Sequence, residues 1–198
     1  VQHVSVADET VDVAAKCALH AVDALRLPDG LSAGLPWFYQ SWSRDELISL
    51  KALMLEGNEA FVKRVLFKWL ARLEGVSLRA TEGGTSSVDA PGWLFLRVED
   101  FLKWLDGRQM RDEVVSVKEL QIIRSSLKKY LNACLSSLSQ NGLIPNAPLT
   151  TWMDTEAGGD TREGCRVEIQ ALVFAACRLW RDLELREHPL ERRLKIAV

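Results

Sequence analysis

Apolar residues recur at every third or fourth position through most of this 198-residue chain. This spacing places them along one face of an α-helix. The clearest stretch lies between residues 59 and 75, where seven apolar side chains follow the helical period: Phe61, Val62, Val65, Leu66, Trp69, Leu70 and Leu73. Alternation of apolar and polar residues, which indicates β-strands, is almost absent. The pattern therefore predicts an all-α protein.

Glycine, proline and asparagine residues divide the pattern into six expected helices in three successive pairs. The second helix is expected to start at Ser43, which has the spacing of a capping box with Glu46. Asn58 is expected to cap the third helix and Asp89 to open the fourth. The fifth runs from about residue 114 to about 140, and the sixth carries Val167 to Trp180. The first helix has an apolar face of Val11, Ala15, Ala18, Val22 and Leu25.

Three long connections precede the second, fourth and sixth of these helices. They cover the segment from Gly34 to Trp42, residues 77–90 and residues 143–163. Long loops without secondary structure are uncommon in compact domains and usually have a function. In an array of paired helices, these three loops are expected to lie at the same end.

Composition excludes several classes of protein. A net charge of −2 gives no electrostatic indication of nucleic-acid binding. No apolar run approaches the roughly 18 residues of a membrane helix, and no secretory signal is visible. The cysteines fit neither a zinc motif nor a compact disulfide framework, so we expect buried free thiols, a cytoplasmic location, and no metal or cofactor. The four are Cys17, Cys134, Cys165 and Cys177.

Aromatic residues stand beside carboxylates where the long loops meet helices. Trp37 and Trp42 precede Asp45, Trp93 follows Asp89, and Trp152 precedes Asp154, with Glu168 further along. Neutral sugars are bound by carboxylates that accept hydrogen bonds and by flat rings that stack on C–H faces. Glycoside hydrolysis also requires two carboxyl groups, one as acid and one as base or nucleophile. The three segments therefore predict a sugar site.

Structural roles could also explain these acids. Asp45 and Glu46 suit the first turn of a helix, Asp89 suits a cap, and Asp154 suits a turn. A helix N-terminus also lowers the pKa of a carboxyl group, whereas a general acid requires a raised pKa. Asp45 can therefore act as an acid only if burial against Trp42 or a neighbouring carboxylate outweighs the helix dipole.

Four segments, in order, resemble the amylo-α-1,6-glucosidase domain of glycogen debranching enzymes. The first contains Gly34-Leu35-Pro36-Trp37-Phe38 and Trp42-Ser43-Arg44-Asp45-Glu46-Leu47. The others are Ser87-Val88-Asp89-Ala90-Pro91-Gly92-Trp93, Thr151-Trp152-Met153-Asp154 and Arg166-Val167-Glu168-Ile169-Gln170-Ala171-Leu172. Each segment alone is weak evidence, but the ordered set from residue 34 to 172 is fairly specific.

The resemblance implies an (α/α)6 barrel, of which this chain would form about half. It implies inverting hydrolysis of the α-1,6-linked glucose at glycogen branch points, with glycogen or another branched α-glucan as partner. Asp45 would be the general acid. The residues expected to bind the sugar are Trp37, Trp42, Arg44, Asp89, Trp93, Trp152, Asp154 and Glu168.

Two departures from the family pattern matter. Ser43 stands where most members have glycine, and the glutamate that acts as general base in the family has no matching segment here. Because the chain also begins with Val1 rather than Met, we expect residues 1–198 to be the N-terminal half of a catalytic domain. Residues 184–198 would then be a charged tail or linker to the remaining half of the barrel, and the fragment alone would be inactive.

Three alternatives remain open. The chain could belong to a related (α/α)6 glucosidase that acts on another α-linked glucoside. It could bind oligosaccharide without hydrolysing it. It could also be a plain helical scaffold, in which case Trp42, Trp93 and Trp152 would be buried and far apart.

Overall fold

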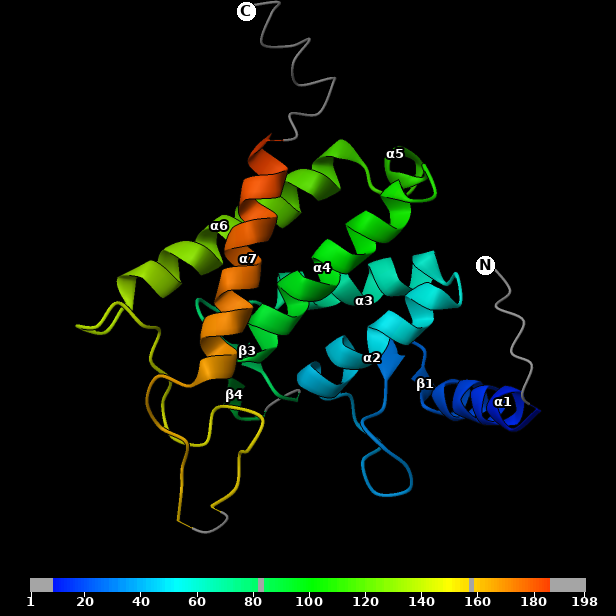
Figure 1. Ribbon diagram of the computed structural model, residues 1–198, viewed down its shortest axis with the longest axis horizontal. Coiled ribbons are helices and arrows are strands. Elements are labelled where there is room, and N and C mark those ends of the chain that lie inside the picture. Colours follow the sequence, from blue (N-terminus) through cyan, green and yellow to red (C-terminus); the bar gives the residue numbers. More distant parts are fainter. Residues whose placement is uncertain (1–8, 82–83, 157–158, 186–198) are drawn as a thin grey trace, which may run out of the picture.

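Figure 1 shows the computed structural model of the chain, which describes residues 9–81, 84–156 and 159–185. Seven helices and two small antiparallel hairpins of two-residue strands make up its regular structure, which confirms the all-α class. The helices are α1 (Glu9–Ala24), α2 (Ser43–Leu55), α3 (Glu59–Ala71), α4 (Ala90–Asp106), α5 (Arg111–Val114), α6 (Val117–Ser136) and α7 (Val167–Leu185). The strands are β1 (Arg26–Leu27), β2 (Gly30–Leu31), β3 (Leu78–Arg79) and β4 (Ser86–Ser87).

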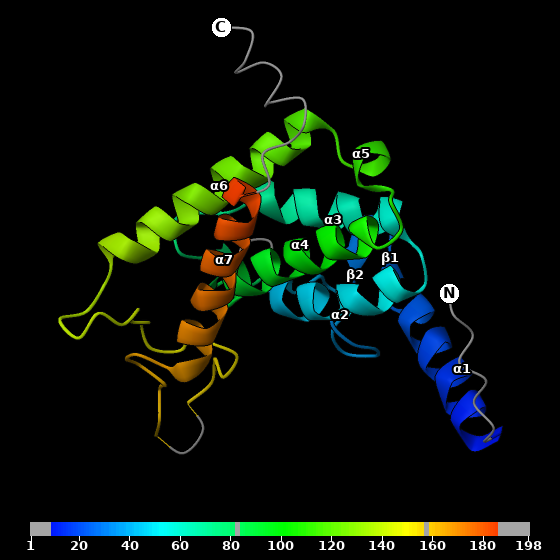
Figure 2. The ribbon, with the colours of Figure 1, turned by 45° about the horizontal axis from the view of Figure 1, so that its top comes forward.

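Helix α4 lies at the centre of the molecule. It contacts α2 and α3 on one side and α7 on the other, and α6 packs against α7 (Figures 1 and 2). Because partners surround it, α4 buries apolar side chains from more than one face. The buried apolar side chains of its middle and end are Leu94, Phe95, Val98, Phe101, Leu102 and Leu105.

A glycine lets the first turn of α4 approach α7 closely. A Cβ atom on Gly92 would lie 2.4 Å from the Cβ atom of Leu172. Real side chains do not come so near, so only glycine allows this approach. The contact joins the start of α4, which follows one long loop, to the start of α7, which follows another. The three long loops lie at the same end of the molecule (Figure 1), as expected.

Helix α1 is amphipathic, but its apolar stripe is largely uncovered. It projects from the body of the molecule in both views (Figures 1 and 2). Val11, Ala15 and Ala18 are exposed, and only Val22 and Leu25 pack partly against the core. The expected apolar stripe is therefore present, but its first three positions do not contribute to the core.

At the starts of the second, third and fourth helices, the N-cap side chains make no capping hydrogen bond. Trp42 occupies the N-cap position of α2, and the buried Ser43 Oγ has no hydrogen-bond partner among the described residues. Asn58 and Asp89 occupy N-cap positions, but neither side chain makes a capping hydrogen bond. Asn58 and Asp89 thus stand at the expected positions without a side-chain cap, whereas Ser43 is the first residue of α2 rather than its N-cap, so the capping box expected there was wrong.

A true capping box occurs at α6. Ser116 Oγ accepts a hydrogen bond from Glu119 N at 3.3 Å, and the Glu119 carboxylate accepts one from Ser116 N at 2.8 Å. Helix α6 therefore begins at Val117 rather than near residue 114, and the short α5 precedes it. Helix α6 also ends earlier than expected, at Ser136.

Among the four cysteines, only Cys134 is buried. The expectation of buried thiols was therefore wrong for Cys17, Cys165 and Cys177, which are exposed. All four are free thiols.

The charged C-terminal segment begins inside a helix. Helix α7 continues to Leu185, so Glu184 is helical, and the rest of the expected tail, residues 186–198, lies outside the described residues. None of the helices in the described part of the chain is long and apolar enough to cross a membrane.

Candidate active site

The first turn of α2 and the start of α4 meet through an ion pair. Arg44 Nε donates to Asp89 Oδ2 at 2.7 Å, and a second guanidinium nitrogen donates to Asp89 Oδ1 at 3.1 Å. The Asp89 side chain is almost fully buried. Such a two-point contact fixes the orientation of both groups. Asp89 therefore holds Arg44 rather than capping its own helix.

Two further contacts join the second long loop to its neighbours. Ser87 Oγ donates to Asp89 Oδ1 at 2.5 Å and accepts from Arg44 at 3.2 Å. Val88 N donates to the carbonyl oxygen of Thr150 at 2.9 Å. The second long loop thus contacts the first turn of α2 on one side and the third long loop on the other.

Arg162 organises the third long loop. Its guanidinium donates to Glu168 and to Thr151 Oγ1, and lies 5.1 Å from the centre of the Trp152 ring. Its carbonyl oxygen accepts a hydrogen bond from Asn146 Nδ2 at 2.6 Å. Sequence reasoning missed this residue, because no local motif marks it.

The carboxyl group of Asp45 has a raised pKa. Partial removal of water by the surrounding protein is the largest cause, although the side chain still reaches solvent. The charges of Asp154 and Asp89 raise the pKa further, whereas the Asp45 backbone N–H and Arg44 lower it. The net shift of the Asp45 pKa is therefore upward, whereas a helix N-terminus alone would lower it. Asp45, Asp89 and Asp154, which come from three distant segments, thus lie near enough to affect one another electrostatically.

The candidate tryptophans differ in exposure. Trp37 is 80% exposed and Trp152 is 54% exposed. Trp42 and Trp93 are half-buried: Trp42 makes an edge contact with Phe38, with ring centres 6.3 Å apart, and Trp93 packs against the core. The scaffold alternative, which requires three buried tryptophans, is therefore wrong for Trp152.

The structure brings most of the expected residues into two linked groups. One contains Arg44, Asp45, Asp89 and Asp154, and the other contains Trp152 and Glu168, joined through Arg162. The second and third loops connect the groups through the Val88–Thr150 hydrogen bond. The Trp93 backbone N–H donates to the carbonyl oxygen of Asp89 at 3.1 Å in the first turn of α4, and its ring packs against the core, whereas Trp37 lies on the first long loop and is mostly exposed. Among the described residues, no set of three or more His, Cys, Asp or Glu side chains is placed to hold a metal ion.

Comparison with known proteins agrees with the order of the motifs. The family described as amylo-alpha-1,6-glucosidase matches residues 22–188, which include every candidate site residue. No curated protein matches the chain. Since the match covers most of the 198 residues, this chain belongs to the amylo-alpha-1,6-glucosidase family.

Proposed function

We propose that the chain is part of a glycoside hydrolase that removes α-1,6-linked glucose at glycogen branch points, with inversion and with Asp45 as the general acid. The raised pKa of Asp45 is the observation that supports this role most directly. A group that donates a proton to the leaving oxygen must remain protonated near the working pH. A first-turn acid with a purely structural role would have a lowered pKa.

The surrounding residues suit a neutral sugar. The Arg44–Asp89 pair is rigid and offers hydrogen-bond donors and acceptors without excess charge. Trp152 presents an exposed ring that Arg162 holds in place, and Glu168 accepts from the same guanidinium. In this proposal Trp152 stacks on the sugar, and Asp154 and Glu168 accept its hydroxyl hydrogens. We propose that Trp37, Trp42 and Trp93 also bind the sugar.

Inversion requires a second carboxylate on the opposite face of the sugar, about 6.5–9.5 Å from the acid. We propose that this base belongs to the remaining half of an (α/α)6 barrel, with residues 1–198 as the N-terminal half and 184–198 leading toward the other. In this proposal the fragment alone is inactive. A cytoplasmic location remains a prediction.

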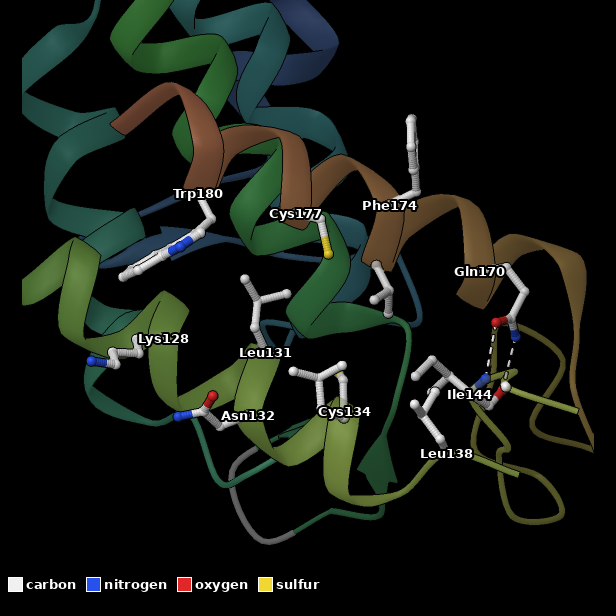
Figure 3. A pocket seen from close by; sticks show the side chains of 13 residues that line it. Lys128, Leu131, Asn132, Cys134, Leu138, Ile144, Gln170, Phe174, Cys177 and Trp180 are labelled. Atoms are coloured by element: carbon white, nitrogen blue, oxygen red, sulfur yellow. Dashed lines mark hydrogen bonds between the residues drawn. The ribbon is translucent and has the colours of Figure 1, made fainter. Parts of the chain in front are cut away.

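The groove between α6 and α7 supports the existence of further helices. It has a volume of about 590 Å³ and is lined mainly by apolar side chains. In Figure 3, Trp180 and Cys177 of α7 face Leu131 and Lys128 of α6 across it. Leu135 and Phe174 at the groove are 64% and 70% exposed. Apolar surface of this kind commonly marks an interface.

Glucose release from a branched limit dextrin tests the activity. The assay uses the longest natural polypeptide that contains this chain, as wild type and as Asp45→Asn. We expect the substitution to reduce kcat by at least about 10²-fold, since general acid catalysis contributes 10²–10⁴-fold. Glu163→Gln, an exposed acid near the third loop's end, is the control and should leave kcat unchanged. Equal rates for Asp45→Asn and wild type would refute the proposed role.

The exposed rings of Trp37 and Trp152 also fit the alternative of oligosaccharide binding without hydrolysis. Titration with a linear maltooligosaccharide, followed by tryptophan fluorescence, separates the two. Binding without glucose release from any α-glucoside by the longest polypeptide would favour the binding module. Release from a different α-glucoside only would favour a related glucosidase.

A further inference from the structure

Glu46, the residue after the candidate acid, is buried and accepts four hydrogen bonds. Its side chain is 0% exposed. Oε1 accepts from the backbone N–H of Leu31 at 2.7 Å. Oε2 accepts from Ser41 Oγ at 2.9 Å, from Lys68 Nζ at 2.7 Å and from Trp69 Nε1 at 2.5 Å. One carboxylate therefore gathers donors from β2, from the first long loop and from α3.

The surrounding chain is shaped to admit this carboxylate. A Cβ atom on Gly30 would lie 1.8 Å from Glu46 Oε1, so a side chain at that position cannot coexist with it. Lys68 Nζ, besides its bond to Glu46, donates to the carbonyl oxygen of Asp29 at 2.8 Å. The β1–β2 hairpin is thus joined to α3 and to the first turn of α2 at a single point.

Consecutive residues of an α-helix point about 100° apart. With Glu46 directed into the core, Asp45 is directed outward, where the charges of Arg44, Asp89 and Asp154 act on it. The bond from Ser41 also fixes the end of the aromatic loop immediately before Trp42. The orientation of Asp45 therefore depends on how firmly its neighbour is held.

We propose that Glu46 is the positioning residue for Asp45: its buried carboxylate fixes the rotation of the first turn of α2 and holds the aromatic loop against it. The inference rests on the proposed function, in which Asp45 donates the proton. Stability alone gives little reason for such a group, because a buried ion pair is often no more stabilising than apolar residues of similar volume. The four hydrogen bonds that converge on Glu46 instead fix the position of the neighbouring residue, Asp45.

The test compares Glu46→Gln with Glu99→Gln. Glu99 is a second buried carboxylate, which accepts from Arg178 and Lys103 on the α4–α7 side of the molecule. It lies ten residues along α4 from Asp89, or about 15 Å. Both variants lose a buried ionic contact, so both should lower Tm. Only Glu46→Gln should affect Asp45.

Two measurements follow each variant: kcat and KM for glucose release by the longest polypeptide, and the pKa of the Asp45 carboxyl by NMR in this chain. Glu46→Gln should lower kcat on the order of 10²-fold, the loss that a misplacement of about 1 Å can produce, with little change in KM. It should also move the pKa of Asp45 toward its ordinary value, because a loosened first turn readmits water. Glu99→Gln should leave kcat and the Asp45 pKa unchanged.

Identical behaviour of the two variants in kcat and in the Asp45 pKa would overturn the inference. If Glu46→Gln does not fold, Ser41→Ala removes a single bond from the same carboxylate. It should shift both readouts in the same direction by a smaller amount, and wild-type values would again overturn the inference. Failure of the proposed function is distinguishable: Asp45→Asn would then retain activity, while the NMR titration would still report whether Glu46 positions Asp45.

Discussion

At Asp45, burial and helix geometry act on one carboxyl group in opposite directions. The backbone N–H and Arg44 favour its ionised form, and loss of water together with Asp154 and Asp89 disfavours it. The second set prevails, so the folded protein binds the Asp45 proton more tightly than the unfolded chain does. A local rule about helix starts predicts the first set only. The second set depends on residues more than 40 positions away.

The sign of this shift predicts how Asp45→Asn changes stability with pH. A raised folded pKa means that wild type loses stability as pH rises from the model-peptide value of 3.8 through the folded value. Asparagine cannot ionise, so the variant avoids this loss. At pH 7 its Tm should equal or slightly exceed that of wild type, and below about pH 3 the two should coincide. Thermal unfolding by circular dichroism between about pH 2.5 and pH 7 measures the difference. A variant less stable than wild type at pH 7 would contradict the assignment.

Arg162 and Asp89 show the limit of motif reasoning at this scale. Asp89 was expected to bind sugar, with a helix cap as the structural alternative, but its ion pair with Arg44 was not foreseen. Arg162 was not recognised at all, although it contacts Trp152, Thr151 and Glu168. A sequence marks which residue types stand at a loop–helix junction. It does not mark which distant partner each one meets.

At the scale of elements, apolar periodicity predicted the helices and capping rules failed at several of their starts. The spacing Ser-x-x-Glu occurs at Ser43 and again at Ser116. At the second site the glutamate returns to the backbone of its own helix start, and at the first it is drawn into the core by donors from α3 and β2. Tertiary contacts decided between two equivalent local patterns. The (α/α)6 barrel itself remains a prediction, since closure depends on elements beyond those described.

The two serines therefore predict different stability changes. Ser116→Ala should lower the free energy of unfolding by about 1 kcal/mol, the usual value of an N-cap. Ser43→Ala is the matched control and should be neutral or slightly stabilising, because the buried Ser43 Oγ has no partner among the described residues. Urea unfolding at pH 7 measures both. The expectation fails if Ser43→Ala costs as much as Ser116→Ala.

The cost of Ser116→Ala should also fall at low pH. Burial raises the pKa of Glu119, but the Ser116 backbone, Lys63 and the Ser116 hydroxyl outweigh it and lower the pKa overall. Stability from the ionised carboxylate is therefore present above the unfolded pKa and is lost as pH falls through the folded one. Urea unfolding of wild type and Ser116→Ala, repeated at acidic pH, shows whether the capping box depends on the charge of Glu119.

The approach of α4 to α7 gives a second prediction at the scale of elements. Gly92→Ala should destabilise the protein by about 1–3 kcal/mol, as overpacking of a tight contact does, because its Cβ would meet Leu172 at 2.4 Å. Gly107→Ala, at the other end of the same helix, is the control. Its nearest atom would be 3.6 Å away, so alanine there should be neutral or stabilising by up to about 1 kcal/mol. Equal effects would show that the α4–α7 distance adjusts freely.

At the scale of the whole molecule, two amphipathic surfaces are left uncovered by the residues that the structure describes. Helix α1 exposes Val11, Val13 and Leu19, and the α6–α7 groove exposes Leu135 and Phe174. Periodicity correctly placed apolar residues on one face of each helix. It could not show whether a neighbour covers that face, because the same stripe serves a core and an interface equally. Helix α1 is an example, because its sequence shows the apolar stripe but not that most of it is exposed.

The uncovered groove predicts the behaviour of the chain on its own. Burial of apolar area is worth roughly 25 cal/mol per Å², so the α6–α7 groove should drive self-association at high concentration. The double substitution Leu135→Ser and Phe174→Ser should shift sedimentation toward monomer and reduce binding of a hydrophobic dye, with little loss of Tm because both side chains are mostly exposed. Trp37→Ser removes an even more exposed ring from a loop that does not line the groove and should leave association unchanged. A wild-type chain that stays monomeric and binds no dye would indicate that the groove needs no cover, and would remove the support that it gives to a larger barrel.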